Sequence, residues 1–352
     1  MEHANAKGQC LLINEVINKG ICVACGACVG LCPYFDYFDG KVIVLDTCTS
    51  DTWRCLQLCP QADYADTSLN RSTGSELDTS PIGQFKRILI ARSSDHKTRE
   101  NAQYGGVVSG LLIYAIEKGL INSVILTDRG NDTSPSGFIA RNRFDILDCA
   151  GSRYSASGGL SALNMAIKNN EERLGIVGLP CQMAALARMK FMNPDGKERS
   201  DHINLKIGLF CTWAMDYRKL NEYLGSIGLK GPAKKYDIPP PPSQIFQLLT
   251  ENGWSEISLG NIRPFIQKGC SLCQDMTAEW ADISVGAVEG LEEWNTVIVR
   301  NDIGLNFIND AIEEHIITID TLPEENLKHL REASLNKREK GVLARRAMNN
   351  LK

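Results

Sequence analysis

The most informative stretch of the sequence holds four cysteines at short and regular spacing. The pattern is C-x2-C-x2-C-x3-C-P, and it consists of Cys22, Cys25, Cys28, Cys32 and Pro33. Bacterial two-cluster ferredoxins use this pattern, with three thiolates on one cluster and the fourth on the other. Small residues between the cysteines, such as Gly26 and Ala27, let backbone amides approach the cluster sulfides. The stretch therefore predicts iron–sulfur ligation.

A second and less complete cysteine motif follows, and it preserves the closing C-x3-C-P. It consists of Cys48, Cys55, Cys59 and Pro60, with Thr49 and Thr52 where a regular repeat would place further ligands. If the motifs exchange their last ligands as ferredoxins do, one four-iron cluster is bound by Cys22, Cys25, Cys28 and Cys59. The second site is then formed by Cys32, Cys48 and Cys55. Three thiolates suit a three-iron cluster, or a 4Fe-4S cluster completed by water or by a residue such as Asp51.

Four further cysteines are dispersed over the rest of the chain: Cys181, Cys211, Cys270 and Cys273. The first two follow apolar runs typical of buried strands, at residues 174–178 and 203–210. Ligands in α/β folds collect at the carboxyl ends of strands. Taken alone, four such thiols suit an all-thiolate zinc site and an iron–sulfur cluster about equally. The ferredoxin motif favours the cluster, because a chain of clusters needs a further carrier.

Composition narrows the class of protein. The net charge of −4 and pI near 5.8 argue against a nucleic-acid binder, and no apolar run approaches the length of a membrane span. The N-terminal sequence lacks a signal pattern, so we expect a cytoplasmic protein whose thirteen cysteines do not form disulfides. Cys10 has no clear partner and is interpreted as structural, and no role is predicted for Cys149. With five histidines in the whole chain, we expect no histidine-based metal site, and the sequence shows no Ser/His/Asp triad.

Several elements that must position these residues can be predicted. Alternating apolar residues at 41–45 fit the small hairpin of a ferredoxin fold, and Asn252-Gly253 fits the turn of a second hairpin. Residues 87–91, 107–118 and 123–127 predict a strand, a helix and a strand. Gly105 and Gly106 precede this helix, where bare amides favour an anionic ligand, although a tight turn explains the glycines as well. The proline run 239–242 predicts a stiff extended segment.

Four groups of residues together resemble one known family. They are Gln103-Tyr-Gly-Gly-Val-Val, Val177-Gly-Leu-Pro-Cys-Gln182, Ile207-Gly-Leu-Phe-Cys211, and Cys270-x2-Cys273-Gln-Asp with Ala281-Asp-Ile-Ser-Val-Gly286. In combination and order these motifs closely resemble the coenzyme F420 hydrogenase/dehydrogenase beta-subunit family over residues 82–300. A ferredoxin module in front resembles the family members that carry such an extension.

The resemblance implies an FAD and a four-iron cluster in the main domain. The implied cluster ligands are Cys181, Cys211, Cys270 and Cys273. The flavin is implied to lie near Gly105, Gly106, Ser109, Ser152, Arg153, Tyr154, Gly178 and Pro180. We therefore expect an α+β ferredoxin-like module over residues 1–62 and a polar linker over 63–80. An α/β flavin- and iron–sulfur-binding domain follows over 81–325. A basic helical tail over 326–352 is interpreted as solvated rather than as a partner-docking arm.

The function that this resemblance implies is a conversion between hydride and single-electron transfer. Coenzyme F420 as substrate would exchange a hydride with FAD, which releases electrons singly to the clusters. The electrons would pass to or from a larger redox complex, such as a hydrogenase, a formate dehydrogenase, a heterodisulfide reductase or a respiratory-type complex. No side-chain acid or base is required. The alternatives are the same fold with NAD(P)H or ferredoxin as the partner, and a non-catalytic relay or zinc-stabilised docking subunit.

Overall fold

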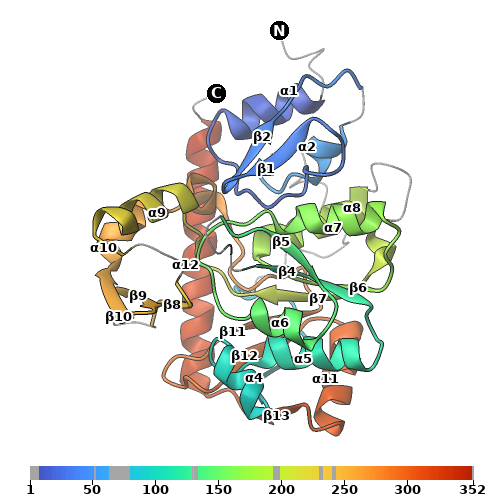
Figure 1. Cartoon of the computed structure of the whole chain (residues 1–352), viewed down its shortest axis with the longest axis vertical. Coiled ribbons are helices and arrows are strands. Elements are labelled where there is room, and N and C mark those ends of the chain that lie inside the picture. Colours follow the sequence, from blue (N-terminus) through green and yellow to red (C-terminus); the bar gives the residue numbers. More distant parts are fainter. Residues whose placement is uncertain are drawn as a thin grey trace.

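The protein consists of a small N-terminal module above a larger main domain, with a long C-terminal helix beside both (Figure 1). The computed structural model describes residues 8–50, 53–62, 80–128, 130, 134–192, 199–229, 233–239 and 243–350. Three regions named above lie outside the described residues: Asp51 with Thr52, nearly all of the predicted linker, and the last three residues of the proline run.

The N-terminal module is built from short elements around an apolar core. It contains α1 (Gly8–Leu12), the π-helical turn η1 (Ile13–Ile17), β1 (Phe35–Phe38), β2 (Lys41–Val44) and α2 (Arg54–Leu58). Strands β1 and β2 pair in an antiparallel hairpin, as the alternation at 41–45 predicts. Asp39 and Gly40 form the turn, both with positive φ, which is the geometry that an Asp-Gly pair favours.

A mixed sheet of eight strands forms the main domain, in the order β13-β3-β12-β11-β7-β6-β4-β5. Neighbouring strands from β4 through β6 and β7 to β11 are parallel, and the other strands pair antiparallel. The strand bounds are β3 (Arg87–Ser93), β4 (Ser123–Thr127), β5 (Gly137–Ala140), β6 (Leu174–Gly178), β7 (Ile203–Leu209), β11 (Ile283–Ala287), β12 (Asn295–Val299) and β13 (Ile317–Asp320). The predicted strands at 87–91, 123–127, 174–178 and 203–210 are confirmed.

Helices cover both faces of this sheet. One core joins the sheet to α5 (Val107–Glu117) and α11 (Asp302–Glu313), and a second joins it to α7 (Gly159–Lys168) and α8 (Pro180–Met192). The second core also includes Val23, Cys25 and Leu58, so the N-terminal module packs on the α7–α8 face. The remaining short helices of this domain are α4 (His96–Asn101), α6 (Arg143–Asp148), η3 (Arg199–His202) and η5 (Lys268–Leu272).

A three-stranded antiparallel sheet forms a side unit of the main domain. Its strands are β8 (Lys235–Asp237), β9 (Ile245–Thr250) and β10 (Gly253–Ser258), and the predicted hairpin at Asn252-Gly253 joins the last two. The fully buried Phe246 belongs to its apolar core. Helices α9 (Tyr217–Ser226) and α10 (Leu259–Ile262), with the turn η4 (Arg263–Phe265), complete the unit.

The C-terminal helix α12 (Glu324–Asn349) confirms the predicted helical tail but not its solvation. Ser334 and Gly341 are buried, and Ala344 and Met348 pack against the core of the N-terminal module. The interpretation of this segment as a solvated helix is therefore wrong for one face. The apolar residues Ala344 and Met348 lie on the same helix as the basic residues, and the high charge of the tail led to the prediction of a solvated helix.

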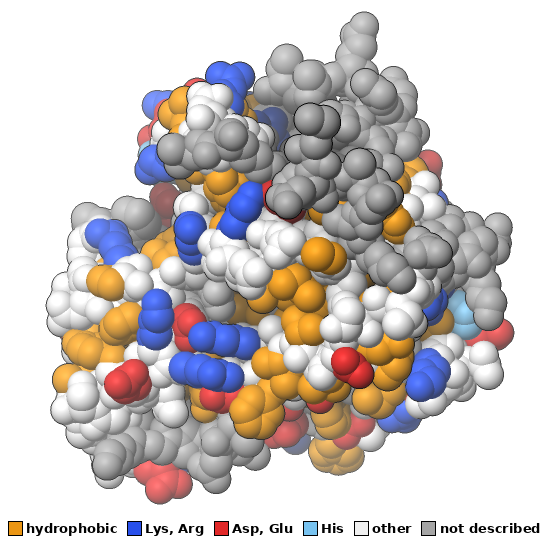
Figure 2. Space-filling model, turned by 90° about the horizontal axis from the view of Figure 1, so that it is seen from above, with side chains coloured by type: hydrophobic (Ala, Val, Ile, Leu, Met, Phe, Trp, Pro, Cys, Tyr) orange, Lys and Arg blue, Asp and Glu red, His pale blue; other side chains and the backbone are white. Residues whose placement is uncertain are grey.

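No helix within the described ranges has both the length and the apolar character that a membrane span needs. Viewed from the side of the N-terminal module, basic and acidic side chains are interspersed with apolar ones (Figure 2).

Candidate metal centre

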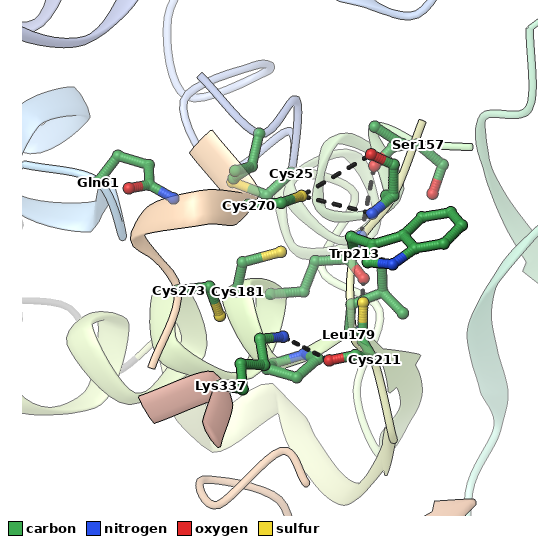
Figure 3. A pocket seen from close by; sticks show the side chains of 15 residues that line it. Cys25, Gln61, Ser157, Leu179, Cys181, Cys211, Trp213, Cys270, Cys273 and Lys337 are labelled. Carbon is green, nitrogen blue, oxygen red and sulfur yellow. Dashed lines mark hydrogen bonds between the residues drawn. The ribbon is translucent and has the colours of Figure 1, made fainter. Parts of the chain in front are cut away.

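Four dispersed cysteines of the main domain line one cavity, together with Lys337 and Trp213: Cys181, Cys211, Cys270 and Cys273. Figure 3 shows their side chains around a common space. Cys181 lies in the first turn of α8, directly after β6, and Cys211 follows β7. Because β6 and β7 are parallel neighbours, with Gly178 opposite Gly208, the residues after them meet at one edge of the sheet.

The other two thiols come from the 3-10 helix η5 and the residue after it. The backbone amide of Ala214 donates to the sulfur of Cys270 at 3.4 Å. After Cys273 the chain is fixed by Asp275, whose carboxylate accepts from the amides of Thr277 and Ala278 at 2.9 and 2.8 Å. These bonds hold the two cysteines facing the strand ends.

Burial and mutual proximity act on the ionisation of these thiols. Burial, followed by the neighbouring thiols, raises the pKa of Cys181 well above its usual value. Burial raises the pKa of Cys211 to about 12, although the ammonium group of Lys337 opposes this shift. The pKa of Cys270 is raised chiefly by burial. Thiols in this setting hold their protons until a metal cation replaces them.

Lys337 of α12 provides a positive charge at this cavity. Its ammonium group donates to the carbonyl oxygen of Cys211. Burial alone would lower the pKa of Lys337, but the groups of Cys211, Cys273 and Asp275 outweigh it and raise the pKa. A half-buried, protonated amine beside four cysteines suits a site that carries negative charge.

The cysteines of the N-terminal module fall into two neighbourhoods. Burial is the largest cause that raises the pKa of Cys22 to about 11, and the Cys59 thiol is the next. For Cys55, burial and then Cys32 and Cys48 raise the pKa to about 11. The exchanged arrangement of the two motifs would group the same cysteines, and the ligand assignment stays a prediction. The loop of Cys48 is held by Gln9, which accepts from the Cys48 amide at 2.6 Å and donates to the Asp46 carbonyl at 2.8 Å.

One relationship was not predicted: Cys25 of the N-terminal module lines the same cavity as the four dispersed cysteines. The module approaches very closely here, since a Cβ built on Gly26 would lie 2.5 Å from the carbonyl oxygen of Gly158. The amide of Leu160 donates to the Cys25 carbonyl at 3.1 Å, and Gln61 donates to the Gly269 carbonyl at 3.2 Å. These contacts place the first cysteine neighbourhood against the cavity of the main domain.

The two remaining cysteines lie apart from this cavity. Cys10 is exposed on α1 and its sulfur accepts from the Asn14 side chain at 3.4 Å. Cys149 ends α6, and burial raises its pKa to about 12.

The donor set bears on the choice between a single ion and a cluster. Across the described ranges, no three His, Cys, Asp or Glu side chains are grouped so that they could hold one metal ion. Four thiolates can hold one tetrahedral zinc ion or the four irons of a cubane. Four half-buried cysteines, an amide donor to the Cys270 sulfur and a nearby cation fit an iron–sulfur cluster.

The residues predicted to lie near a flavin are divided between three places, and two of them are at the end of β6 and at the start of α5. Pro180 lines the cysteine cavity, and Gly178 precedes it at the end of β6. Gly106 is the left-handed N-terminal cap of α5, and Ser109 is buried within that helix. The absence of a side chain at Gly105 is explained by packing, because a Cβ there would lie 2.8 Å from the side-chain oxygen of Asn295. Gly105 alone therefore does not indicate a ligand.

The segment Ser152–Tyr154 joins the main sheet to the side unit. The guanidinium of Arg153 donates to backbone carbonyls of Asp128, Cys149, Ala150 and Gly151 at 2.9–3.3 Å, which orders the loop after α6. The hydroxyl of Tyr154 accepts from the amide of Ile238 at 3.1 Å. Gln103 and Tyr104 donate to the Asp237 carboxylate at 2.8 and 2.7 Å. Asp237 belongs to none of the sequence motifs and was not predicted.

Comparison with known proteins gives one consistent family. Residues 88–164 and 171–325 match the N-terminal and C-terminal parts described for the beta subunit of coenzyme F420 hydrogenase/dehydrogenase. The chain is 30% identical to coenzyme F420 hydrogenase subunit beta of Methanothermobacter thermautotrophicus, over 76% of this chain and 97% of that protein. It is 28% identical to the coenzyme F420-dependent sulfite reductase of Methanocaldococcus jannaschii, over 96% of this chain but 52% of that protein.

A solved structure gives the same result for the fold. One chain of the F420-reducing NiFe hydrogenase complex from Methanosarcina barkeri superposes with a TM-score of 0.70 at 26% identity. The match covers 76% of this chain and 94% of that chain.

Proposed function

Because the chain belongs to the coenzyme F420 hydrogenase/dehydrogenase beta-subunit family, we propose that it is an electron-transfer subunit of an F420-linked redox complex. The finer proposal is that it exchanges electrons between coenzyme F420 and three iron–sulfur sites through a bound FAD. The four dispersed cysteines would hold one cluster. The N-terminal cysteines would hold the other two, with Cys32, Cys48 and Cys55 at a three-iron cluster or at a 4Fe-4S cluster with a non-cysteine ligand.

The observation that carries this proposal is the shared cavity of Cys25 and the dispersed cysteines. Cys25 of the first neighbourhood lies beside the main-domain set. The pKa of Cys28, in the same neighbourhood, is raised by burial, by Cys25, Cys22 and Cys59, and then by Cys55 of the second neighbourhood. The three sets thus follow one another through the protein. A continuous series of ligands is what stepwise transfer of single electrons needs, and an isolated structural zinc site would not require it.

FAD is proposed from the family, near Gly105, Gly106, Ser109, Ser152–Tyr154, Gly178 and Pro180. When bound, a flavin supplies the conversion between a hydride and two single electrons. Around a bound flavin, the role of the protein is to exclude water and to fix the positions of the segments that hold the flavin. Burial around Cys181, Cys211 and Cys25 provides the first, and the hydrogen bonds of Arg153 and Asp237 provide the second.

The decisive experiment is the iron, acid-labile sulfide and flavin content of the anaerobically isolated chain. We expect about 11 or 12 irons per chain, depending on the nuclearity of the second N-terminal site, and one FAD. A colourless protein with zinc and no flavin would overturn the proposal and support the docking-subunit alternative. Bleaching of the bound flavin by reduced F420, compared with NADH and NADPH, then identifies the hydride carrier.

A cysteine variant tests the ligand assignment. Cys270→Ala should lose the iron of one cluster and keep flavin reduction by the hydride donor, since the flavin residues are not changed. Cys149→Ala is the matched control, because Cys149 lies outside the cavity and should keep all iron. Full iron content in Cys270→Ala would show that the assignment is wrong.

A further inference from the structure

Helix α12 brings two half-buried cations to the junction between the N-terminal module and the main domain. They are Lys337 and Arg345, and the buried Gly341 lies midway between them. Eight residues of helix correspond to about 12 Å along the axis and about 80° around it. Both side chains therefore leave the same side of the helix, one facing each cysteine neighbourhood.

Lys337 faces the main-domain cysteines. It lines their cavity and donates to the carbonyl oxygen of Cys211. The carboxylate of Asp275, two residues after Cys273, accepts from the backbone amides of Thr277, Ala278 and Glu279 at 2.8–2.9 Å. In the described part of the chain Lys337 forms no direct ion pair with that carboxylate, so its charge faces the thiols.

Arg345 faces the boundary with the first N-terminal neighbourhood. Its guanidinium donates to the carbonyl of Leu272 at 2.9 Å and to the side-chain oxygen of Gln61 at 3.3 Å. Gln61 is two residues after Cys59, and Leu272 precedes Cys273. The charge of Arg345 also favours the ionised form of Cys59, although burial keeps that pKa raised. Arg188 of α8 acts on Cys59 in the same sense.

We propose that Lys337 and Arg345 set the reduction potentials of the two clusters that meet at this junction. Lys337 would act on the cluster of Cys181, Cys211, Cys270 and Cys273, and Arg345 on that of Cys22, Cys25, Cys28 and Cys59. This inference rests on the proposed function. Reduction adds one negative charge to a cluster, and a fixed cation in a low-dielectric interior stabilises that charge and raises the potential. The Arg345 effect is the smaller one, because Arg345 follows Arg188 among the charges that act on Cys59, whereas Lys337 is the first charge that acts on Cys211.

The test is a redox titration of the anaerobically isolated full chain, followed by electron paramagnetic resonance. Lys337→Gln keeps a donor for the Cys211 carbonyl and removes the charge, whereas Lys337→Arg keeps the charge. The matched control is Lys340→Gln, since Lys340 is exposed on the same helix and its charge is screened by solvent. For Arg345→Gln, the control is the exposed Arg346→Gln. The signal of the main-domain cluster is identified as the one missing in Cys270→Ala.

We expect Lys337→Gln to shift the midpoint potential of the main-domain cluster downward, and to shift the first N-terminal cluster less, since only Cys25 of that set lines the same cavity. Arg345→Gln should shift only the first N-terminal cluster, by a smaller amount. Lys337→Arg and both controls should keep wild-type potentials. Wild-type potentials in Lys337→Gln at full iron content would overturn the proposal. It would also be overturned if Lys337→Gln lost one cluster entirely, because Lys337 would then serve assembly and not potential. A wild-type chain without iron would instead contradict the proposed function itself.

Discussion

Gly341 of the C-terminal helix lies directly against the backbone of Cys273. A Cβ built on Gly341 would be 2.6 Å from the carbonyl oxygen of Cys273, closer than real Cβ contacts allow. Glycine inside a helix costs about 0.5–1 kcal/mol relative to alanine, so its presence here needs a reason. The reason is the close approach of α12 to the segment that carries Cys270 and Cys273.

Adding a side chain at this position tests that contact. In Gly341→Val, the new side chain meets backbone that cannot move aside without displacing Cys273, and such overpacking costs about 1–3 kcal/mol. We expect a lower free energy of unfolding and reduced iron content. The control is Gly225→Val in α9, where an added Cβ meets no atom within 4 Å. Equal stability of the two variants would show that α12 can shift freely.

The pairing of the N-terminal cysteines gives a second prediction. If the motifs exchange their last ligands, Cys59→Ala and Cys22→Ala should remove the same paramagnetic signal. Cys32→Ala and Cys55→Ala should remove the other. The reason is that Cys59 neighbours Cys22, while Cys32 neighbours Cys55. Cys10→Ala is the control, since the Cys10 thiol is exposed on α1. Joint loss in Cys22→Ala and Cys32→Ala would mean that each motif binds its own cluster.

The parts of the site that depend on residues close together in the chain could be predicted from the sequence. Apolar runs ending before Cys181 and Cys211 were enough to place both at strand ends, because parallel neighbouring strands end at the same edge. The spacing of Cys22 to Cys32 predicted an iron–sulfur motif in the same way. The hairpin at 41–45 and the strand–helix–strand at 87–127 followed from periodicity alone.

Relationships between distant segments could not be predicted from the sequence. Nothing in the residues around Cys25 indicates that it lines the same cavity as Cys181, because this depends on how the module docks on α7. Lys337 and Arg345 belong to a tail whose high charge predicts solvation, and only the tertiary packing shows which face is buried. The glycine pair at Gly105 was open to two interpretations, and packing against Asn295 explains Gly105.

Glu279 provides a prediction on pH. Burial, followed by the Asp275 carboxylate, raises the pKa of Glu279 to about 7, although Arg338 and Arg300 oppose the shift. A carboxyl with a raised pKa in the folded state favours folding while it is protonated. Its contribution is therefore present below about pH 4.5 and is lost as the pH rises to about 7. In this window the wild-type free energy of unfolding should fall relative to Glu279→Gln by up to about 1.4 kcal/mol per pH unit.

The measurement is denaturant unfolding of the two proteins from pH 4.5 to pH 8, under anaerobic conditions. Glu256→Gln is a suitable control, because Glu256 is exposed on β10. The difference between wild type and Glu279→Gln should stop changing above about pH 7. A difference that is independent of pH would show that the Arg338 ion pair keeps Glu279 ionised throughout.

The last prediction concerns Asp237, which joins the side unit to the main domain. Its carboxylate accepts from the side chains of Gln103 and Tyr104 at 2.8 and 2.7 Å and from the amide of Ile238 at 2.9 Å. Hydrogen bonds to a charged acceptor contribute about 1.5–3 kcal/mol each, more than bonds to a neutral amide. Asp237→Asn keeps an oxygen acceptor and removes the charge, so we expect loss of about 1–2 kcal/mol.

The loss should be local, because Asp237 ends β8 at the edge of the three-stranded sheet. Hydrogen exchange of the β8 and β9 amides should accelerate, while amides of the central strands β6 and β7 should keep their protection. Burial, then Asp237, also raises the pKa of Tyr104, so the variant should ionise this phenol at lower pH than the wild type does. Unchanged exchange in β8 would show that apolar packing around Phe246, and not the carboxylate, fixes the side unit.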